Sequence, residues 1–158
     1  MAAQAELVIA PVDIRDAVCQ DLLVRYEEDI AARMKPGFEL AKAAPPGPHD
    51  FDPPEGIFYL CRVAGEAVAC GGLRTIGAGI GEIRRMYVVP EARGAGIGRE
   101  LLSVLEQAAR ERQLHIVRLD TAEELDEAQR LYKRAGFEEI PDYNGNIFAA
   151  RWYEKRLK

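Results

Sequence analysis

The sequence predicts a single domain of the α/β (α+β) class that spans residues 1–158. The chain has 158 residues, of which 48% are hydrophobic, and this is enough for one sizeable core. Its apolar residues occur in short alternating runs typical of strands and in longer stretches with helical spacing. A glycine-rich turn joins one of the alternating runs to an amphipathic helix. Together these observations favour one sheet covered by helices.

The first part of the chain predicts one strand, one helix and a long loop. The strand covers residues 7–10, and Asp13 is expected to cap a helix that continues to Met34. Residues 35–56 carry too many prolines and glycines for a continuous element, although residues 38–44 could form a short helical turn. A loop of this length is often a lid or a binding loop.

Strands and helices then alternate toward the C-terminus. Two strands are predicted around a tight turn at residues 64–65, and a glycine-containing hairpin follows them. A further strand, helix, strand and helix come next, and Gly136 stops the second helix at its C′ position. Two final strands complete the sheet. The ranges are 57–63 and 66–76 for the first strands, 77–81 for the hairpin turn, 82–89, 97–111, 113–121 and 123–135 for the alternating elements, and 137–140 and 147–157 for the last strands.

The turn at residues 93–98 has the features of an anion-binding site. It follows a strand and opens a helix, so several unpaired backbone N–H groups and the positive end of the helix dipole converge there. Glycines at alternate positions allow close approach of a pyrophosphate, and Arg93 and Arg99 flank them with positive charge. Residues 77–81 have nearly the same letters but lie between two strands, which predicts a hairpin instead. Only the later turn is expected to bind phosphate.

Charge and cysteine content exclude several classes of function. The formal net charge of −5 argues against nucleic acid or an anionic membrane as a partner and favours amine-bearing ligands. No signal peptide or membrane span is apparent, so a cytoplasmic location is expected. The three cysteines and two histidines show no metal-ligand spacing. Reduced thiols and no metal are therefore predicted, and His115 is expected at the surface.

Three linked segments resemble the GNAT superfamily of N-acetyltransferases, over residues 82–137. They are Arg84-Arg85-Met86-Tyr87-Val88, the turn Arg93-Gly94-Ala95-Gly96-Ile97-Gly98, and Ala128-x-x-Leu131-Tyr132-x-x-x-Gly136-Phe137. The resemblance implies a mixed, mostly antiparallel sheet that splays in the middle and is flanked by helices. It also implies that acetyl-CoA, as co-substrate, binds between the fourth and fifth strands. The residues expected to bind it are Met86, Tyr87, Val88, Arg93, Gly94, Ala95, Gly96, Ile97, Gly98 and Arg99. Many members carry Asn where this chain has Leu125, so a contact to the pantetheine arm is either missing or made by backbone.

Acetyl transfer to an amine requires a base, a polarised carbonyl and an acid. Backbone groups of Met86 and Val88 are expected to bind the pantetheine arm in the manner of an added strand. A nearby N–H would stabilise charge on the thioester oxygen. On a regular strand Glu82 shares a face with Arg84, Met86 and Val88, and its carboxylate is a candidate base, acting directly or through a water. Alternatively, Glu82 forms a strand-end ion pair with a neighbouring arginine.

Two further positions have alternative roles. By helical pattern alone Tyr132 is a core aromatic, whereas its place in the family-like motif favours a general acid that protonates the CoA thiolate. Of Arg84 and Arg85, one is expected to be solvated and the other to lie in the cleft or in an ion pair; the sequence does not say which.

The acceptor is expected to be a small-molecule or peptide amine. Candidate contacts are Glu28, Tyr143 and Asn144, within a wider acidic and polar set of Glu27, Asp29, Asp50, Asp52 and Asn146. A homodimer is compatible with the sequence. Two other classes compete with this function, a catalytically silent acyl-CoA-binding module and a dinucleotide-binding domain. The second is the weakest, because Arg99 replaces the last glycine of a dinucleotide fingerprint.

Overall fold

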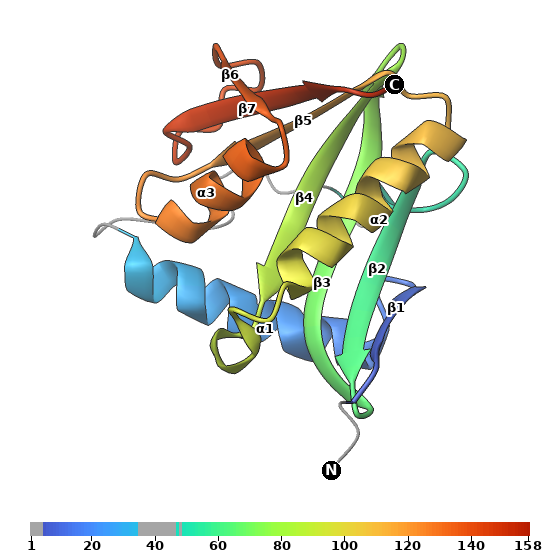
Figure 1. Cartoon of the computed structure of the whole chain (residues 1–158), viewed down its shortest axis with the longest axis vertical. Coiled ribbons are helices and arrows are strands. Elements are labelled where there is room, and N and C mark those ends of the chain that lie inside the picture. Colours follow the sequence, from blue (N-terminus) through green and yellow to red (C-terminus); the bar gives the residue numbers. More distant parts are fainter. Residues whose placement is uncertain (1–4, 35–46, 48) are drawn as a thin grey trace.

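The protein, described here from a computed structural model for residues 5–34, 47 and 49–158, contains a seven-stranded sheet in the order β1-β2-β3-β4-β5-β7-β6 (Figure 1). Neighbouring strands pair antiparallel, except for the parallel pair β4 and β5. The strands are β1 Leu7–Pro11, β2 Gly56–Val63, β3 Glu66–Gly77, β4 Ile80–Val88, β5 Ile116–Thr121, β6 Glu138–Ile140 and β7 Arg151–Arg156. The helices are α1 Ala17–Arg33, the 3₁₀ helix η2 Pro90–Ala92, α2 Ile97–Glu111 and α3 Asp126–Arg134.

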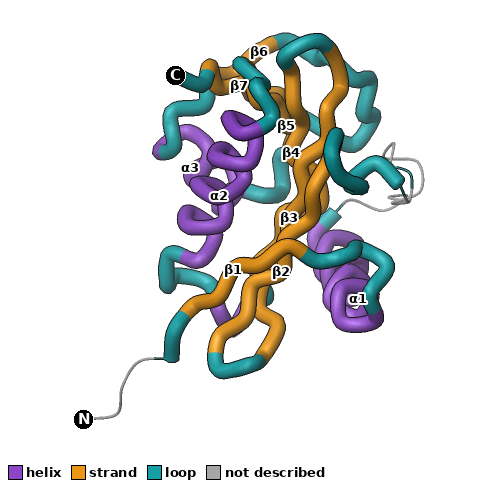
Figure 2. Tube along the Cα trace, turned by 90° about the vertical axis from the view of Figure 1, so that its right-hand side faces the viewer, coloured by secondary structure: helices purple, strands orange, loops and turns teal. Residues whose placement is uncertain are grey.

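The helices cover both faces of the sheet. Helices α2 and α3 lie on one face and α1 lies on the other (Figure 2). Strand β2 shows how the sequence supports both layers, because Tyr59 and Cys61 pack into the core on the α2 side while Phe58 and Leu60 pack into the core on the α1 side. Side chains of successive strand residues point to opposite faces, so a strand buried on both faces is apolar throughout. The predicted sandwich of helices around a sheet is confirmed.

The sheet splays between β4 and β5, as the family resemblance implied. These strands pair at Ile80 with Ile116, Gly81 with Val117, and Glu82 with Arg118. Beyond that point β4 continues to Val88 and β5 to Thr121 without pairing to each other, although β4 still pairs with β3 and β5 with β7. The sheet is therefore not closed by backbone hydrogen bonds between β4 and β5 beyond Glu82 and Arg118.

A bulge in β4 overturns the prediction that Glu82 shares a face with Met86 and Val88. The pairing with β3 shifts register between Cys70 and Gly72, and Arg85 adopts the left-handed conformation with a φ of 58°. Ile83 and Met86 therefore both pack against the core on the α2 side, although residues three apart on a regular strand face opposite sides. Glu82 consequently lies on the other face of the sheet from Met86 and Val88.

The start of α1 also differs from the prediction. Asp16, not Asp13, is the N-cap, and its carboxylate accepts a hydrogen bond from the Val18 N–H. Asp13 instead accepts hydrogen bonds from the backbone and guanidinium of Arg15. Both aspartates precede an apolar periodic stretch, and so either could satisfy the orphan N–H groups of the first turn. The ion pair with Arg15 occupies Asp13, and the helix begins one turn later.

The remaining elements follow the predicted order. The hairpin between β3 and β4 closes through Ala78 and Gly79, with Gly77 paired to Ile80. Helix α3 is stopped by Gly136, which follows the C-cap Ala135 and has a φ of 93°. The Phe137 N–H donates to the Tyr132 carbonyl in a Schellman arrangement. The short helical turn predicted at 38–44 lies outside the described residues. Among the described helices, none is both long and apolar enough to cross a bilayer.

Candidate functional site

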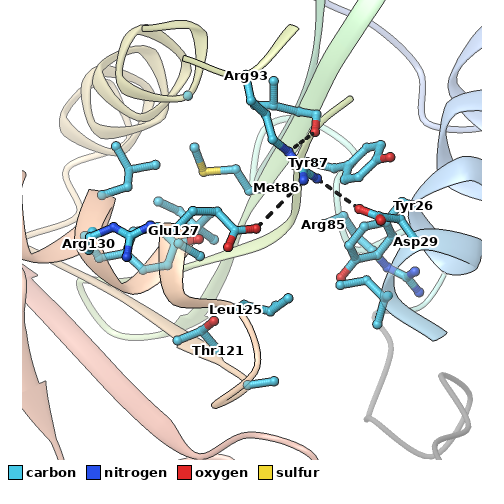
Figure 3. A pocket seen from close by; sticks show the side chains of 18 of the residues that line it. Tyr26, Asp29, Arg85, Met86, Tyr87, Arg93, Thr121, Leu125, Glu127 and Arg130 are labelled. Atoms are coloured by element: carbon cyan, nitrogen blue, oxygen red, sulfur yellow. Dashed lines mark hydrogen bonds and ion pairs between the residues drawn. The ribbon is translucent and has the colours of Figure 1, made fainter. Parts of the chain in front are cut away.

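A cavity of about 940 Å³ passes through the gap between β4 and β5 (Figure 3). One wall comes from the second half of α1, starting at Tyr26, and another wall comes from α3, including Tyr132. Because α1 and α3 lie on opposite faces of the sheet, the cavity connects the two faces. A molecule held on the α2 side can therefore meet a second molecule that enters from the α1 side.

Every residue predicted to bind acetyl-CoA lines this cavity. Gly94 and Gly96 have φ values of 86° and 82°, and Gly96 is the N-cap of α2. A side chain on either glycine would be strained, because only glycine adopts this conformation freely. A Cβ on Gly98 would lie 3.3 Å from a Leu131 methyl group, so this glycine allows close packing of α2 on α3. The turn thus exposes backbone N–H groups at a helix start, which fits a pyrophosphate.

Arg93 crosses the mouth of the cavity and joins its walls. Its guanidinium lies 2.9 Å from Asp29 on α1 and 4.0 Å from Glu127 on α3, and its Nε donates to the Val88 carbonyl at 3.0 Å (Figure 3). Arg33 on α1 also pairs with Glu127. The hydrogen bond from Arg33 is the main reason why the pKa of Glu127 is lowered to about 2. Arg93 is therefore positioned at the predicted phosphate site, and its partners hold α1 against α3.

Glu82 is buried, with an exposed fraction of 1%, and its two carboxylate oxygens accept from several donors. Arg74 donates to Oε1 at 2.9 Å, and Tyr143 donates its hydroxyl to Oε2 at 2.7 Å. The Asn144 amide also donates to Oε2, at 3.3 Å. Burial, followed by the charge of Glu82, raises the pKa of Tyr143. The arginine pairing expected in the alternative interpretation is thus present, and Glu82 lies just behind the cavity rather than in its lining.

Asp120, near the end of β5, is a cavity-lining acid that sequence reasoning missed. Its carboxylate accepts from Arg84 at 2.9 Å, from Asn144 at 2.5 Å and from Asn146 at 3.2 Å. The Asn144 amide donates to both Asp120 and Glu82 and so couples the two carboxylates. The available signal was a polar residue near the carboxyl end of a strand beside its parallel neighbour, where ligands often bind in α/β sheets.

Tyr132 combines both of its predicted environments. Its ring packs against Phe137 and Tyr153 with centroids 5.9 and 6.2 Å apart, while the residue also lines the cavity. Burial is the main cause of the raised pKa of its hydroxyl. The side chain is therefore held rigidly by the core and remains protonated at neutral pH, as a proton donor must be.

The predicted acceptor contacts are placed unequally. Glu28 is exposed and does not line the cavity, whereas Asp29, one residue further along α1, does. Adjacent helix positions differ by about 100° in direction, so the acidic run of α1 could not be assigned from sequence alone. Tyr143 and Asn144 bind Glu82, and Asn146 reaches the cavity itself. The late connection thus supports the site mainly through hydrogen bonds to carboxylates.

Arg84 and Arg85 both line the cavity, and the structure separates their roles. Arg84 is the ion-paired residue, through Asp120. Arg85 lies over the Tyr26 ring, 5.8 Å from its centroid. Among the described residues no cluster of side chains suited to a metal ion is found.

Comparisons with known proteins match this geometry. The model of the acetyltransferase (GNAT) family matches residues 18–137. The chain belongs to this family. It is 38% identical over 85 residues to an IAA acetyltransferase of Azospirillum brasilense, an alignment that covers 53% of this chain and 56% of that protein. The chain thus spans about half the length of the curated relatives it matches.

Solved structures of GNAT proteins share the whole fold. A GNAT acetyltransferase of Staphylococcus aureus Mu50 has a TM-score of 0.81 at 20% identity, covering 97% of this chain and 100% of that one. The PaiA N-acetyltransferase of Thermoplasma acidophilum, solved in complex with coenzyme A, has a TM-score of 0.72 at 17% identity and covers 96% of this chain and 99% of that one. The mixed, mostly antiparallel splayed sheet is therefore the GNAT fold.

Proposed function

We propose that the protein is an N-acetyltransferase that moves the acetyl group of acetyl-CoA to a primary amine by direct attack in a ternary complex. One observation carries the proposal: the glycine turn and the unpaired end of β4 open onto a single cavity that connects both faces of the sheet. An anion site and an exposed strand edge side by side suit a ligand that contains both a pyrophosphate and an amide-rich arm.

Acetyl-CoA supplies the activated acetyl thioester. In the proposal the turn from Arg93 to Arg99 binds its phosphates, and backbone groups of Met86, Tyr87 and Val88 bind the pantetheine arm as an added strand. Arg93 exchanges its contacts with Asp29 and the Val88 carbonyl for a phosphate. The Leu125 side chain has no hydrogen-bonding group, so any contact to the arm at this position would come from backbone.

The proton transfers fall to groups on the two sides of the gap. The amine nitrogen bonds to the acetyl carbon as the carbon–sulfur bond breaks, so the nitrogen gives up a proton and the sulfur gains one. We assign the first transfer to Glu82, which acts through a water. This water would lie near Asp120, the carboxylate that shares the Asn144 amide with Glu82. We assign the second to the hydroxyl of Tyr132, which lines the same cavity and is protonated at neutral pH.

Two measurements test the proposal. Acetyl-CoA should raise the melting temperature of the protein by mass action, whereas a dinucleotide such as NAD should not. CoA release should then be followed across a panel of primary amines. Binding of acetyl-CoA without release for any amine would point to a silent acyl-CoA-binding module, and a stronger shift with the dinucleotide would overturn the assignment of the turn.

A further inference from the structure

Arg85 lines the cavity from a strained backbone position. It is the residue at the β4 bulge, and its φ of 58° is uncommon for a residue with a side chain. Such conformations cost free energy and persist where the surrounding structure holds them, often at ligand sites. The bulge places Arg85 directly before Met86, whose backbone binds the pantetheine arm in the proposed function. Strain at this position thus aims a long cationic side chain at the acceptor side of the cavity.

The contacts of Arg85 differ from those of three other arginines that line the cavity, whereas Arg99, Arg130 and Arg134 line it near the glycine turn and α3. Arg33, Arg84 and Arg93 all line the cavity and form ion pairs, with Glu127, Asp120 and Asp29 respectively. Arg85 stacks on the Tyr26 ring at 5.8 Å, and within the described part of the chain no carboxylate lies within 4.0 Å of its guanidinium. Stacking leaves the edge of the planar guanidinium available for hydrogen bonds.

Positive and negative groups converge on the same part of the cavity. Tyr26, Arg85 and Asp120 all line this cavity. Burial raises the pKa of Tyr26, the positive charges of Arg85 and Arg84 oppose this rise, and the negative charge of Asp120 adds to it. An acceptor in this cavity would meet the carboxylate of Asp120 and the guanidinium of Arg85.

We propose that Arg85 binds a carboxylate of the acceptor, so that the substrate is an amino acid or another amine that carries a carboxylate close to its nitrogen. This inference rests on the proposed N-acetyltransferase function. The planar guanidinium pairs with a carboxylate through two parallel hydrogen bonds, and the Tyr26 ring fixes its orientation. With the carboxylate so held, the ammonium group lies toward Asp120 and Asn146. An acceptor without a carboxylate leaves Arg85 without its charged partner in a partly desolvated site.

The test compares each carboxylate acceptor with its own amide. CoA release by the wild-type protein is measured with a panel of α- and β-amino acids and with the corresponding amino acid amides. We expect kcat/KM to be roughly 10- to 100-fold higher for the acid of the best pair, the size of one hydrogen-bonded charge pair. Because the amine of the amide loses its proton more readily, a preference for the acid would not come from amine basicity.

Variants then assign the preference to Arg85. Arg85→Gln should remove most of the difference between acid and amide, mainly through KM, and leave the acetyl-CoA affinity unchanged. Arg85→Lys keeps the charge without the planar fork, and should retain part of the preference. Arg151→Gln is the matched control, because Arg151 pairs with Glu139 on β6 and does not line the cavity, and this variant should behave as wild type.

Three outcomes would overturn the inference. Acids and amides turned over equally well by the wild-type protein would show that the acceptor needs no carboxylate, with the proposed function intact. An Arg85→Gln variant that slows both classes equally would give Arg85 a general role in the site. No release with any amine would remove the proposed function and this inference together. If Arg85→Gln fails to fold, the wild-type comparison and Arg85→Lys still decide.

Discussion

The Arg84 guanidinium donates a hydrogen bond to Asp120 at 2.9 Å, and this contact joins β4 to β5 beyond the point at which their backbones stop pairing. This side-chain contact thus links β4 to β5 where the backbone hydrogen bonds between the two strands have ended. Arg84 and Asp120 are both nearly buried, with side-chain exposures of 11% and 8%. Asp120 therefore lines the cavity and is also fixed within the sheet, so its position depends on the pairing with Arg84.

Gly96→Asp should abolish acetyl-CoA binding. A side chain at the N-cap of α2 would block the approach of the pyrophosphate to the backbone, and its charge would repel phosphate. Gly65→Asp is the matched control, because Gly65 has a similar φ of 80° and open space around it in the turn between β2 and β3. Calorimetry should show lost affinity in the first variant only. Wild-type affinity in Gly96→Asp would place the phosphates elsewhere.

Glu82→Gln should lower turnover at neutral pH by roughly a hundredfold or more while acetyl-CoA binding survives. The rate should recover as the pH rises, because more of the acceptor is then already a free amine. Loss of the charge next to Arg74 should also reduce the free energy of unfolding, by up to about 3 kcal/mol.

Asp120→Asn is the informative comparison for Glu82. Both substitutions keep the shape of the side chain, and both carboxylates accept from the Asn144 amide. A pH-dependent rate loss confined to Asp120→Asn would move the base to that residue. A melting temperature that falls in Glu82→Gln without any change in rate would make Glu82 a structural charge.

Tyr132→Phe should reduce kcat and kcat/KM together by about 10- to 1000-fold, with little change in acetyl-CoA affinity or melting temperature. The ring contacts with Phe137 and Tyr153 survive the change, so folding and chemistry are separated. Tyr153→Phe provides the control, because the buried Tyr153 hydroxyl has no hydrogen-bond partner in the described structure. That variant should keep its activity and be as stable as wild type or more so. A fully active Tyr132→Phe enzyme would return Tyr132 to the core.

The pair of Arg33 and Glu127 should make stability depend on pH in the acid range. The folded-state pKa of Glu127 is lowered from 4.5 to about 2, so its contribution is present above pH 4.5 and is lost as the pH falls toward 2. Since the Glu127 side chain is 42% exposed, solvent screening limits this contribution to about 1 kcal/mol or less.

Denaturant unfolding of wild type and Glu127→Gln at several pH values checks this expectation. The difference in unfolding free energy should be largest near neutral pH and should vanish near pH 2. A difference that grows on acidification would contradict the assigned cause of the pKa shift.

Much of the fold was predictable because its signals are local. The glycines at 94, 96 and 98 mark a strand-to-helix turn, and Gly136 marks a helix end; each acts within a few residues of its own position. The ten residues expected at the acetyl-CoA site accordingly all line one cavity. Their role in binding stays a prediction.

The features that could not be predicted depend on contacts between distant segments. The β4 bulge arises from the pairing of β4 with β3. None of Arg84, Arg85 and Met86 is a residue type that favours a positive φ, so the sequence does not indicate the bulge. The contacts of Asp120 come from distant segments, Arg84 on β4 and the loop that carries Asn144 and Asn146. Asp13 failed as a cap because Arg15 competes for its carboxylate.

The separation of β4 from β5 bears on the risk of aggregation through exposed sheet edges. Two strands that stop pairing create two new sheet edges, and exposed edges invite pairing with strands of other chains. Here both edges face a cavity walled by α1 on one side and α3 on the other, where another protein's strand has little access. In the proposed function the pantetheine arm, which carries its own amide groups, is narrow enough to pair with these edges. Their interior position thus keeps them from acting as a template for aggregation.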